Sequence, residues 1–285
     1  MSSGTQLADE DGDTSDWIEL YNAESTTVYL DGYCLSDDVT DPYKWEFPTV
    51  TIPAQNFLLI FASGKDRPVG HWETVIDWGD NWKYFVGTEE PPADWREIDF
   101  DDSGWSEGPS GFGFGDDDDA TIIPATISFY IRHTFQVSEP DSIITALLHV
   151  DYDDAFVAYL NGFEIARENI GETGLVPAFD ETADGSHEAV IYQGELPDMF
   201  TIKNLSALLQ EGDNVLSIQT HNASSTSSDM SMIPFLTFGM REEPAGASGC
   251  ATLIEPTMPH LHTNFKLSNE GESLILSDNA GATID

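Results

Sequence analysis

Carboxylates recur at alternating positions near the start of the chain. Asp9, Asp11 and Asp13 form a D-x-D-x-D pattern, and Asp16 follows three residues later. Carboxylate oxygens at this spacing are typical ligands of hard cations such as Ca²⁺. The pattern is not an EF-hand, because Thr14 stands at the sixth position, where that loop requires glycine, and no glutamate stands at the twelfth. It predicts a calcium-binding loop, and the alternative is a solvated loop whose aspartates cap turns.

A second set of carboxylates lies in the middle of the chain. Asp116, Asp117 and Asp118 belong to a run of aspartates, and Asp153 and Asp154 are adjacent. Neighbouring carboxylates cannot all stay ionised without a nearby positive charge, so Ca²⁺ is again the expected cofactor. The alternative is that the run is an exposed surface screened by salt, and that the pair forms a turn before a strand.

Two tryptophans are candidates for carbohydrate binding. Trp78 and Trp82 stand among Asp, Gly and Asn residues at positions 77 and 79–81, which favour an exposed loop. Flat rings in such loops can stack on the apolar faces of sugars, which makes glycans candidate partners. The alternative is a packing role, which we expect for Trp95 and Trp105.

No group of residues in the sequence predicts catalysis. The seven histidines are scattered, apart from His260 and His262, which lack further ligands at zinc spacing. The sequence contains no G-x-S-x-G nucleophile motif. Pairs of carboxylates are uninformative in a chain with 52 acidic residues. We therefore expect a protein that is not an enzyme.

These residues must be positioned by β-strands. Short runs with alternating apolar residues, bounded by Gly, Pro, Asn and Asp, are the dominant local pattern. The clearest runs are residues 17–21, 27–30, 57–62, 128–135, 144–152, 156–160, 214–221 and 273–276. The best helical pattern is a short one at residues 204–210. An all-β sandwich class follows.

Charge and hydropathy restrict the classes of partner. Against 52 acidic residues stand 10 Lys and Arg residues, which gives a formal net charge of −42. Nucleic acids and anionic membrane surfaces are bound by clusters of basic residues, and this sequence has none. No run of about 18 apolar residues could span a bilayer. We expect a secreted, extracellular protein at a cell surface, whose export signal lies outside the given residues.

Two segments resemble known families. Residues 9–67 contain DEDGDTSDWIELYN, LDGYCLSDD, KWEFP and FLLIFASGKDR, which together resemble the lamin-tail domain of bacterial surface proteins. The HTNFKLS-like strand that follows closely in that family stands here at residues 262–268. The segment 72–241 contains WREIDFDDSGW, GPSGFGFGDDDDA, YIRHTFQV and HVDYDDAFVAYLNGFEIAR, and it is similar to the galactose-binding-like jelly rolls that accompany many glycosidases.

The resemblance implies an immunoglobulin-like β-sandwich of lamin-tail type with an inserted galactose-binding-like jelly-roll β-sandwich. The expected domains are residues 1–70 plus 258–285 for the first and residues 71–241 for the second, with a linker at 242–257. The first domain lacks strands that the family has at both ends. We therefore expect either a fragment of a longer polypeptide or a subunit that pairs β-strands with copies of itself or with neighbouring domains.

The two cysteines lie on opposite sides of the inserted segment. Cys34 and Cys250 fit either one long-range disulfide or two buried thiols. A disulfide would connect the end of the insertion to the outer domain.

Together these expectations describe an extracellular, non-catalytic structural or adhesive module that is stabilised by cations. It would form part of a larger surface protein, matrix or filament. The alternative function is a carbohydrate-binding accessory region of a secreted hydrolase whose catalytic domain lies outside this chain. Glycan binding distinguishes the two functions.

Overall fold

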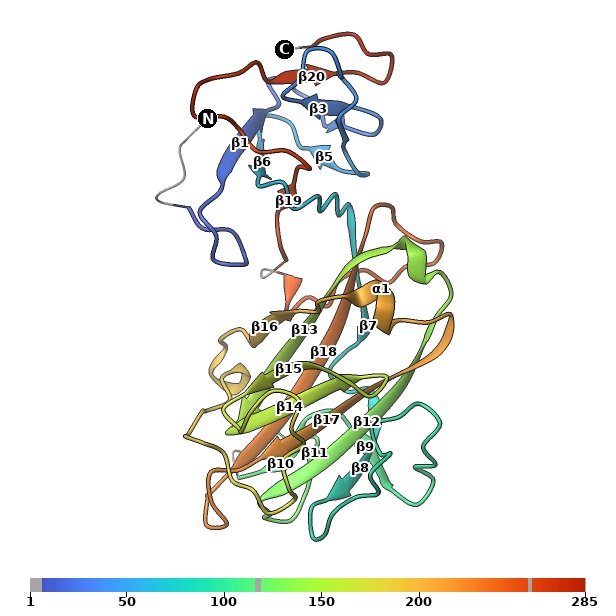
Figure 1. Cartoon of the computed structure of the whole chain (residues 1–285), viewed down its shortest axis with the longest axis vertical. Coiled ribbons are helices and arrows are strands. Elements are labelled where there is room, and N and C mark those ends of the chain that lie inside the picture. The colour runs from blue at the N-terminus through green and yellow to red at the C-terminus, as the bar shows by residue number, and fades with distance from the viewer. Residues whose placement is uncertain (1–6, 116–118, 256–257, 285) are drawn as a thin grey trace. The chain divides into compact units, whose positions relative to one another are not determined.

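The chain forms two compact units in the computed structural model, which describes residues 7–115, 119–255 and 258–284 (Figure 1). The first unit comprises Met1–Glu73, Gly239–Gly249 and Met258–Asp285, and the second comprises Thr74–Phe238 and Cys250–Thr257. The first unit is therefore assembled from segments that are far apart in sequence. Residues 242–257, which were expected to form a linker, are divided between the two units.

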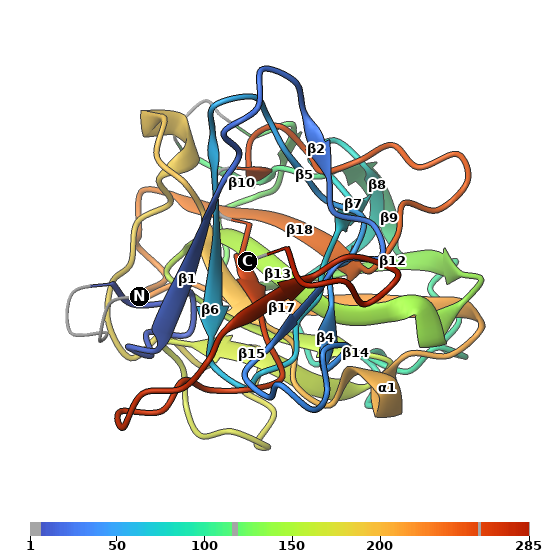
Figure 2. The same ribbon diagram turned by 90° about the horizontal axis from the view of Figure 1, so that it is seen from above.

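A three-stranded sheet forms the centre of the first unit. Strand β1 (Asp16–Tyr21) pairs antiparallel with β6 (Phe57–Ala62), and β6 pairs in parallel with β19 (Leu261–His262). Strands β1 and β6 lie side by side in Figure 2. In this ladder Leu261 stands opposite Ile60 and His262 stands opposite Phe61, so it brings together residues that flank the second unit in sequence.

Shorter strands complete the first unit. Strand β2 (Val28–Tyr29) pairs with β5 (Thr51–Ile52). Strand β3 (Cys34–Ser36) lies between β4 (Trp45–Glu46) and β20 (Ile275–Ser277).

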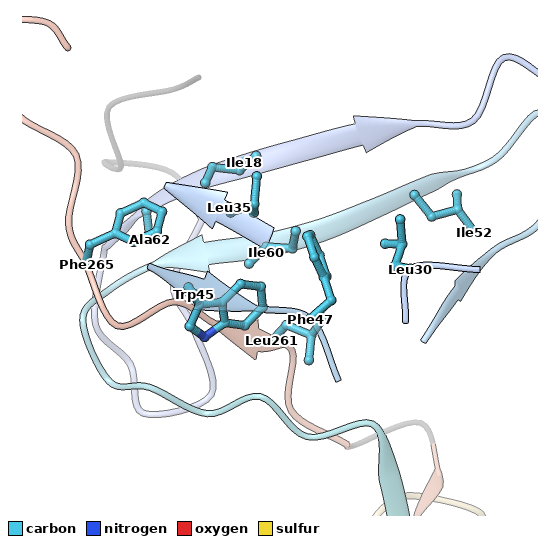
Figure 3. Packing of buried hydrophobic residues seen from close by; sticks show 10 residues of the cluster. All are labelled: Ile18, Leu30, Leu35, Trp45, Phe47, Ile52, Ile60, Ala62, Leu261 and Phe265. Carbon is cyan, nitrogen blue, oxygen red and sulfur yellow. The ribbon is translucent and has the colours of Figure 1, made fainter. Parts of the chain in front are cut away.

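The core of the first unit is built from the inward faces of these strands. Alternation in β1 and β6 places Ile18 opposite Ile60, so that both side chains point to the same side of the sheet. Figure 3 shows the cluster around them, which contains residues from both ends of the chain. Its buried members are Ile18, Leu30, Leu35, Trp45, Phe47, Ile52, Ile60, Ala62, Leu261 and Phe265.

Two larger sheets make up most of the second unit within the described residues. One has the order β11-β10-β18-β13-β16, with β7 also paired to β18, and the other has the order β15-β14-β17-β12-β8-β9. The strands of the first of these sheets are β7 (His71–Ile76), β10 (Phe112–Phe114), β11 (Thr121–Ile122), β13 (Ile143–Asp153), β16 (Asp198–Thr201) and β18 (Met230–Met240). Those of the second are β8 (Asn81–Val86), β9 (Ser106–Pro109), β12 (Ser128–Val137), β14 (Ala155–Leu160), β15 (Phe163–Glu168) and β17 (Gly212–His221). A short α-helix, α1 (Leu205–Leu208), and two 3₁₀ turns, Pro140–Ser142 and Ile191–Gln193, are the helical elements described.

The long strands of the second unit are buried over nearly their whole length. Every residue of β14 is buried, and so are almost all residues of β13, β17 and β18. Aromatic residues outside the strands, among them Trp95, Phe100 and Trp105, pack against one face of β12 and β14. These aromatic residues cover the face of β12 and β14 that does not face the other sheet, so both faces of these strands are buried. The all-β class is confirmed, whereas the lamin-tail and jelly-roll arrangements stay predictions.

Candidate functional site

The acidic loop at residues 9–13 folds around one buried aspartate. Oδ1 of Asp9 accepts hydrogen bonds from the backbone nitrogens of Asp11 (3.1 Å) and Asp13 (3.0 Å). These bonds form a tight turn of the kind that aspartate favours, and they bring the three carboxylates within 4.8 Å of one another. Asp16, expected in the same group, instead begins β1 opposite Ala62.

A lysine occupies the centre of this loop. Nζ of Lys65 lies 2.7 Å from Oδ2 of Asp9, 2.6 Å from Oδ2 of Asp11 and 3.1 Å from Oδ2 of Asp13. Burial opposes the charge of the ammonium group, but the hydrogen bonds that it donates to these three carboxylates raise the pKa of Lys65 above its usual range. The sequence predicted that Ca²⁺ neutralises these aspartates. In the structure, the positive charge of Lys65 does so instead.

The loop in this conformation does not fit a bound calcium ion. Ca²⁺ takes six to eight oxygen ligands at about 2.3–2.6 Å. Here the ammonium group of Lys65 contacts one oxygen of each converging carboxylate and would repel a dication placed among them.

Glu10, which lies within the loop, connects it to the central sheet of the first unit. Oε1 of Glu10 lies 2.7 Å from Nε2 of His262 and 2.9 Å from Nη1 of Arg67. On the other side of the imidazole ring, Nδ1 of His262 lies 2.7 Å from Oγ of Ser63. Burial acts against ionisation of Glu10, yet its bonds to His262 and its proximity to Arg67 lower the pKa of this carboxyl group.

Ser63, His262 and Glu10 have the residue types of a hydrolytic triad. Ser63 is only 4% exposed, and His262 is fully buried and stacks on Phe61 with ring centroids 5.3 Å apart. The hydroxyl of Ser63 also accepts the backbone N–H of Lys65 (3.2 Å). Because the serine faces protein on all these sides, the geometry favours a structural network over nucleophilic attack. We name the set of Glu10, Ser63, Lys65, Arg67 and His262, with the loop at residues 9–13, the acidic-loop network.

The second predicted acidic site is only partly described. Asp116, Asp117 and Asp118 lie outside the described residues. Asp153 is buried, and one of its carboxylate oxygens lies within 4.8 Å of carboxylate oxygens of Glu188 and Asp229. Neither neighbour was predicted from the sequence, because both lie on other segments of the chain.

Asp154 has a different role from Asp153. Its Oδ1 accepts the backbone N–H of His187 (2.9 Å), and its Oδ2 accepts that of Ala223 (2.6 Å). Both oxygens therefore hold loops of the second unit in place. Each oxygen accepts one backbone donor, and the role of Asp154 as a metal ligand stays a prediction.

The two candidate tryptophans differ in exposure. Trp78 is 43% exposed, in a turn that is closed by hydrogen bonds of Asp77 and Asp80. Trp82 was expected to be exposed as well, but this prediction is wrong. It lies in β8, is only 1% exposed and packs against His133 with ring centroids 5.1 Å apart. The polar residues before it form the turn, and the strand begins immediately afterwards.

Of the two alternatives for Cys34 and Cys250, the structure has two thiols and no disulfide, although Cys250 is only half-buried. Cys34 is buried in β3 of the first unit, whereas Cys250 belongs to the second unit. The Cys34 thiol lies 3.9 Å from the carbonyl oxygen of Gly32, and the Cys250 thiol lies 3.6 Å from that of Ala251. Burial raises the pKa of Cys34, so this group stays a thiol at neutral pH.

No helix in the described part of the chain is long and apolar enough to cross a membrane. No family model matches the sequence, and no curated protein matches it.

Several solved structures show a partial likeness. A glycosyl hydrolase family 2 member from Bacteroides cellulosilyticus is 13% identical over 59% of this chain and 20% of its own, with a TM-score of 0.37. A calcium binding mutant of Bacteroides uniformis β-glucuronidase 2 is 16% identical over 59% of this chain and 18% of its own, with a TM-score of 0.36. The β-glucuronidase from Ruminococcus gnavus is 13% identical over 60% of this chain and 29% of its own, with a TM-score of 0.36. The match thus spans less than a third of each of these chains, and the similarity is too low to assign a family or an activity.

Proposed function

We propose that this chain is a non-catalytic structural module of an extracellular assembly, such as a surface layer, matrix or filament. The observation that carries this proposal is the acidic-loop network. It connects residues 9–13, residues 63–67 and His262. One set of contacts joins His262 to Ser63 and Glu10, and the other joins the basic side chains of Lys65 and Arg67 to the acidic residues of the loop. The carboxylate, hydroxyl, imidazole and basic groups of this network are therefore engaged with one another.

Such a network suits a module that must resist unfolding. Its ion pairs are partly buried, and they lie where β6 ends and β19 pairs with it. Water screens a partly buried pair less than an exposed one, and removal of one partner leaves an uncompensated charge. The network thus adds to the strand pairing that holds the discontinuous unit together.

Pairing with other chains would extend this module into an assembly. Strand β1 is at the edge of the three-stranded sheet, since β6 is its sole partner strand among the described residues. An unpaired edge can accept a strand from another molecule. Sedimentation velocity across a range of protein concentrations checks this step: assembly predicts species larger than a monomer, and a monomer at every concentration contradicts it.

The structural function is tested with the variant Ser63→Ala. Removal of a buried hydrogen-bonding hydroxyl is expected to lower the stability of the first unit by about 1–2 kcal/mol. Wild type and variant are compared for hydrolysis of p-nitrophenyl acetate and of a panel of p-nitrophenyl glycosides. The proposal predicts background rates for both. Hydrolysis by the wild type that disappears in Ser63→Ala would identify an enzyme and overturn the proposal.

A second candidate function is glycan binding by the second unit. The exposed indole of Trp78 favours it, because an aromatic ring available in a turn can stack on a sugar. A glycan array with the full chain tests this function, and a purely structural module is expected to give no signal there.

A further inference from the structure

Strand β1 leaves one row of its backbone groups free at the edge of the first unit's sheet. The backbone N–H of Asn22, the residue after β1, donates to the carbonyl oxygen of Asn56 at 3.0 Å. In an antiparallel ladder, residues that bond to the partner strand alternate with residues whose N–H and C=O groups point away from it. The continuous register of β1 and β6 therefore directs the backbone groups of Trp17, Glu19 and Tyr21 away from β6.

These backbone groups are available to a strand from another molecule. The N–H and C=O groups of the three residues make no hydrogen bond with another described residue. Glu19 and Tyr21 are exposed, and Trp17 is half-buried. The edge thus offers a donor and an acceptor at every second residue, which is the spacing that an added strand requires.

The side chains of β1 are arranged symmetrically about Glu19. The residues on either side of it are aliphatic, Ile18 and Leu20, and the next two are aromatic, Trp17 and Tyr21. When two copies of β1 pair antiparallel with Glu19 at the centre, each aromatic residue faces an aromatic one and each aliphatic residue an aliphatic one. A register shifted by two residues places Glu19 opposite an aromatic residue and keeps only one aliphatic pair. The centred register therefore gives the self-complementary contact that a twofold symmetric interface requires.

An exposed aromatic pair lies at one end of this strand. Tyr21 and Phe57 of β6 are 49% and 54% exposed, and their ring centroids lie 4.6 Å apart. The Tyr21 hydroxyl donates to Oε1 of Gln55 at 2.8 Å, which restrains the ring. In the pairing centred on Glu19, Trp17 of the second copy lies beside Tyr21 and removes part of this apolar surface from water.

Charge opposes this pairing at one position. Glu19 is the only charged residue in the segment 17–21, and it would face its counterpart in the second copy. The chain as a whole carries a formal net charge of −42, so two copies repel each other at low salt concentration. Aromatic, aliphatic and like-charge pairs across strands contribute amounts of similar size, so the two aromatic and two aliphatic pairs outweigh the single glutamate pair.

The size of the contact predicts a weak dimer. A strand of six residues is about 20 Å long, and stable interfaces bury about 1,200–2,000 Å² of surface. A contact between one strand of each copy falls below this range. We therefore expect a Kd above about 1 μM, which decreases as salt screens the repulsion between the copies.

We propose that β1 pairs antiparallel with β1 of a second copy of this chain, with Glu19 at the twofold axis. The inference rests on the proposed structural function and names the partner of its free edge. Because both copies use the same strand, this contact closes a dimer, and a larger assembly needs a second contact in addition.

Two substitutions at Glu19 test this pairing by sedimentation velocity of the full chain. Glu19→Gln removes the like charges and keeps the backbone N–H, so it should lower the Kd of the dimer about threefold. Glu19→Pro removes that N–H, which points away from β6, so β1 should stay in its sheet while the dimer is lost. Glu24→Gln, at an exposed glutamate outside the strand, is the control for the change of charge and should leave the Kd unchanged.

A crosslinking test measures the register and does not depend on the folding of Glu19→Pro. Glu19→Cys places two thiols opposite each other at the twofold axis. The Cα atoms of a hydrogen-bonded pair lie about 5.5 Å apart, which is within the range for a disulfide. Oxidation above the Kd should give a covalent dimer on a non-reducing gel, whereas Glu24→Cys and the wild type, with its two native cysteines, should give none.

The outcomes separate the inference from the function on which it rests. Larger species that persist in Glu19→Pro, without a covalent dimer of Glu19→Cys, would contradict the β1 pairing and retain assembly through another surface. A wild type that is a monomer at every concentration would contradict both the inference and the assembly. If Glu19→Gln then dimerises, the role of Glu19 is to protect the edge against pairing.

Discussion

Replacement of Lys65 by methionine tests the acidic-loop network most sharply. The change keeps a long side chain and removes the charge that faces three carboxylates. Asp9 dominates the expected effect, because its side chain is fully buried, whereas those of Asp11 and Asp13 are 26% and 68% exposed. Breaking a fully buried ion pair costs about 3–5 kcal/mol, and partial exposure of Lys65 reduces this to about 2–3 kcal/mol. For a unit of this size, the melting temperature should fall by roughly 10 °C.

The same variant should create a calcium response that the wild type lacks at this loop. Without Lys65, the converging carboxylates repel one another, and Ca²⁺ would relieve this repulsion. A ligand that binds only the folded state adds about 2.7 kcal/mol at a hundred times its Kd. Scanning calorimetry in calcium and in chelator measures both effects. Lys266→Met, a change at an exposed lysine of the same unit, is the control.

Either of two results would contradict this role of Lys65. One is a Lys65→Met variant as stable as the wild type in chelator. The other is a first-unit transition of the wild type that rises with calcium concentration, which would mean that the ion competes successfully with the lysine.

The remaining predictions concern pH and thiols. Burial lowers the pKa of His221 in the second unit to about 4. The unfolded chain therefore binds a proton that the folded unit does not, and the second unit should lose about 3 kcal/mol of stability from this group as pH falls from 6.5 to 4, as measured by denaturant titration at each pH. The lowered pKa of Glu10 implies that its contribution to the first unit is present above about pH 4.5 and lost below it, so a first unit that weakens already at pH 6 would contradict the network. Cys34 and Cys250 should both react with Ellman's reagent after denaturation without reductant, and a melting temperature lowered by dithiothreitol would contradict the absence of a disulfide.

The strand pattern was predictable where an alternating run of residues is bounded by turn-forming residues. The run at residues 57–62 is β6 with the same boundaries, and the runs that became β1, β12 and β17 begin or end within two residues of the observed strands. Strand β18 had no such signal, because Met230–Met240 is an almost continuously apolar segment that includes a proline and is buried on both faces. A buried strand of this kind does not alternate.

The site was less predictable than the fold, because contacts between distant segments decide it. The D-x-D-x-D spacing identified residues that do converge, but nothing in it reveals that Lys65 enters between them. The pairing of Glu10, Ser63 and His262 depends on the β6–β19 ladder, which joins residues separated by the whole second unit. A signal was available in the GKDR sequence that follows β6, since two basic residues in a chain so poor in them are expected to find acidic partners.

Hydrogen exchange on the wild type and on His262→Asn examines the acidic-loop network directly. If His262 connects the segments, its replacement should raise the exchange rates of residues 9–13 and 63–67 together, whereas His260→Asn, two residues away and exposed, should leave both unchanged. Unchanged protection of both segments in His262→Asn would contradict the structural function proposed for the network.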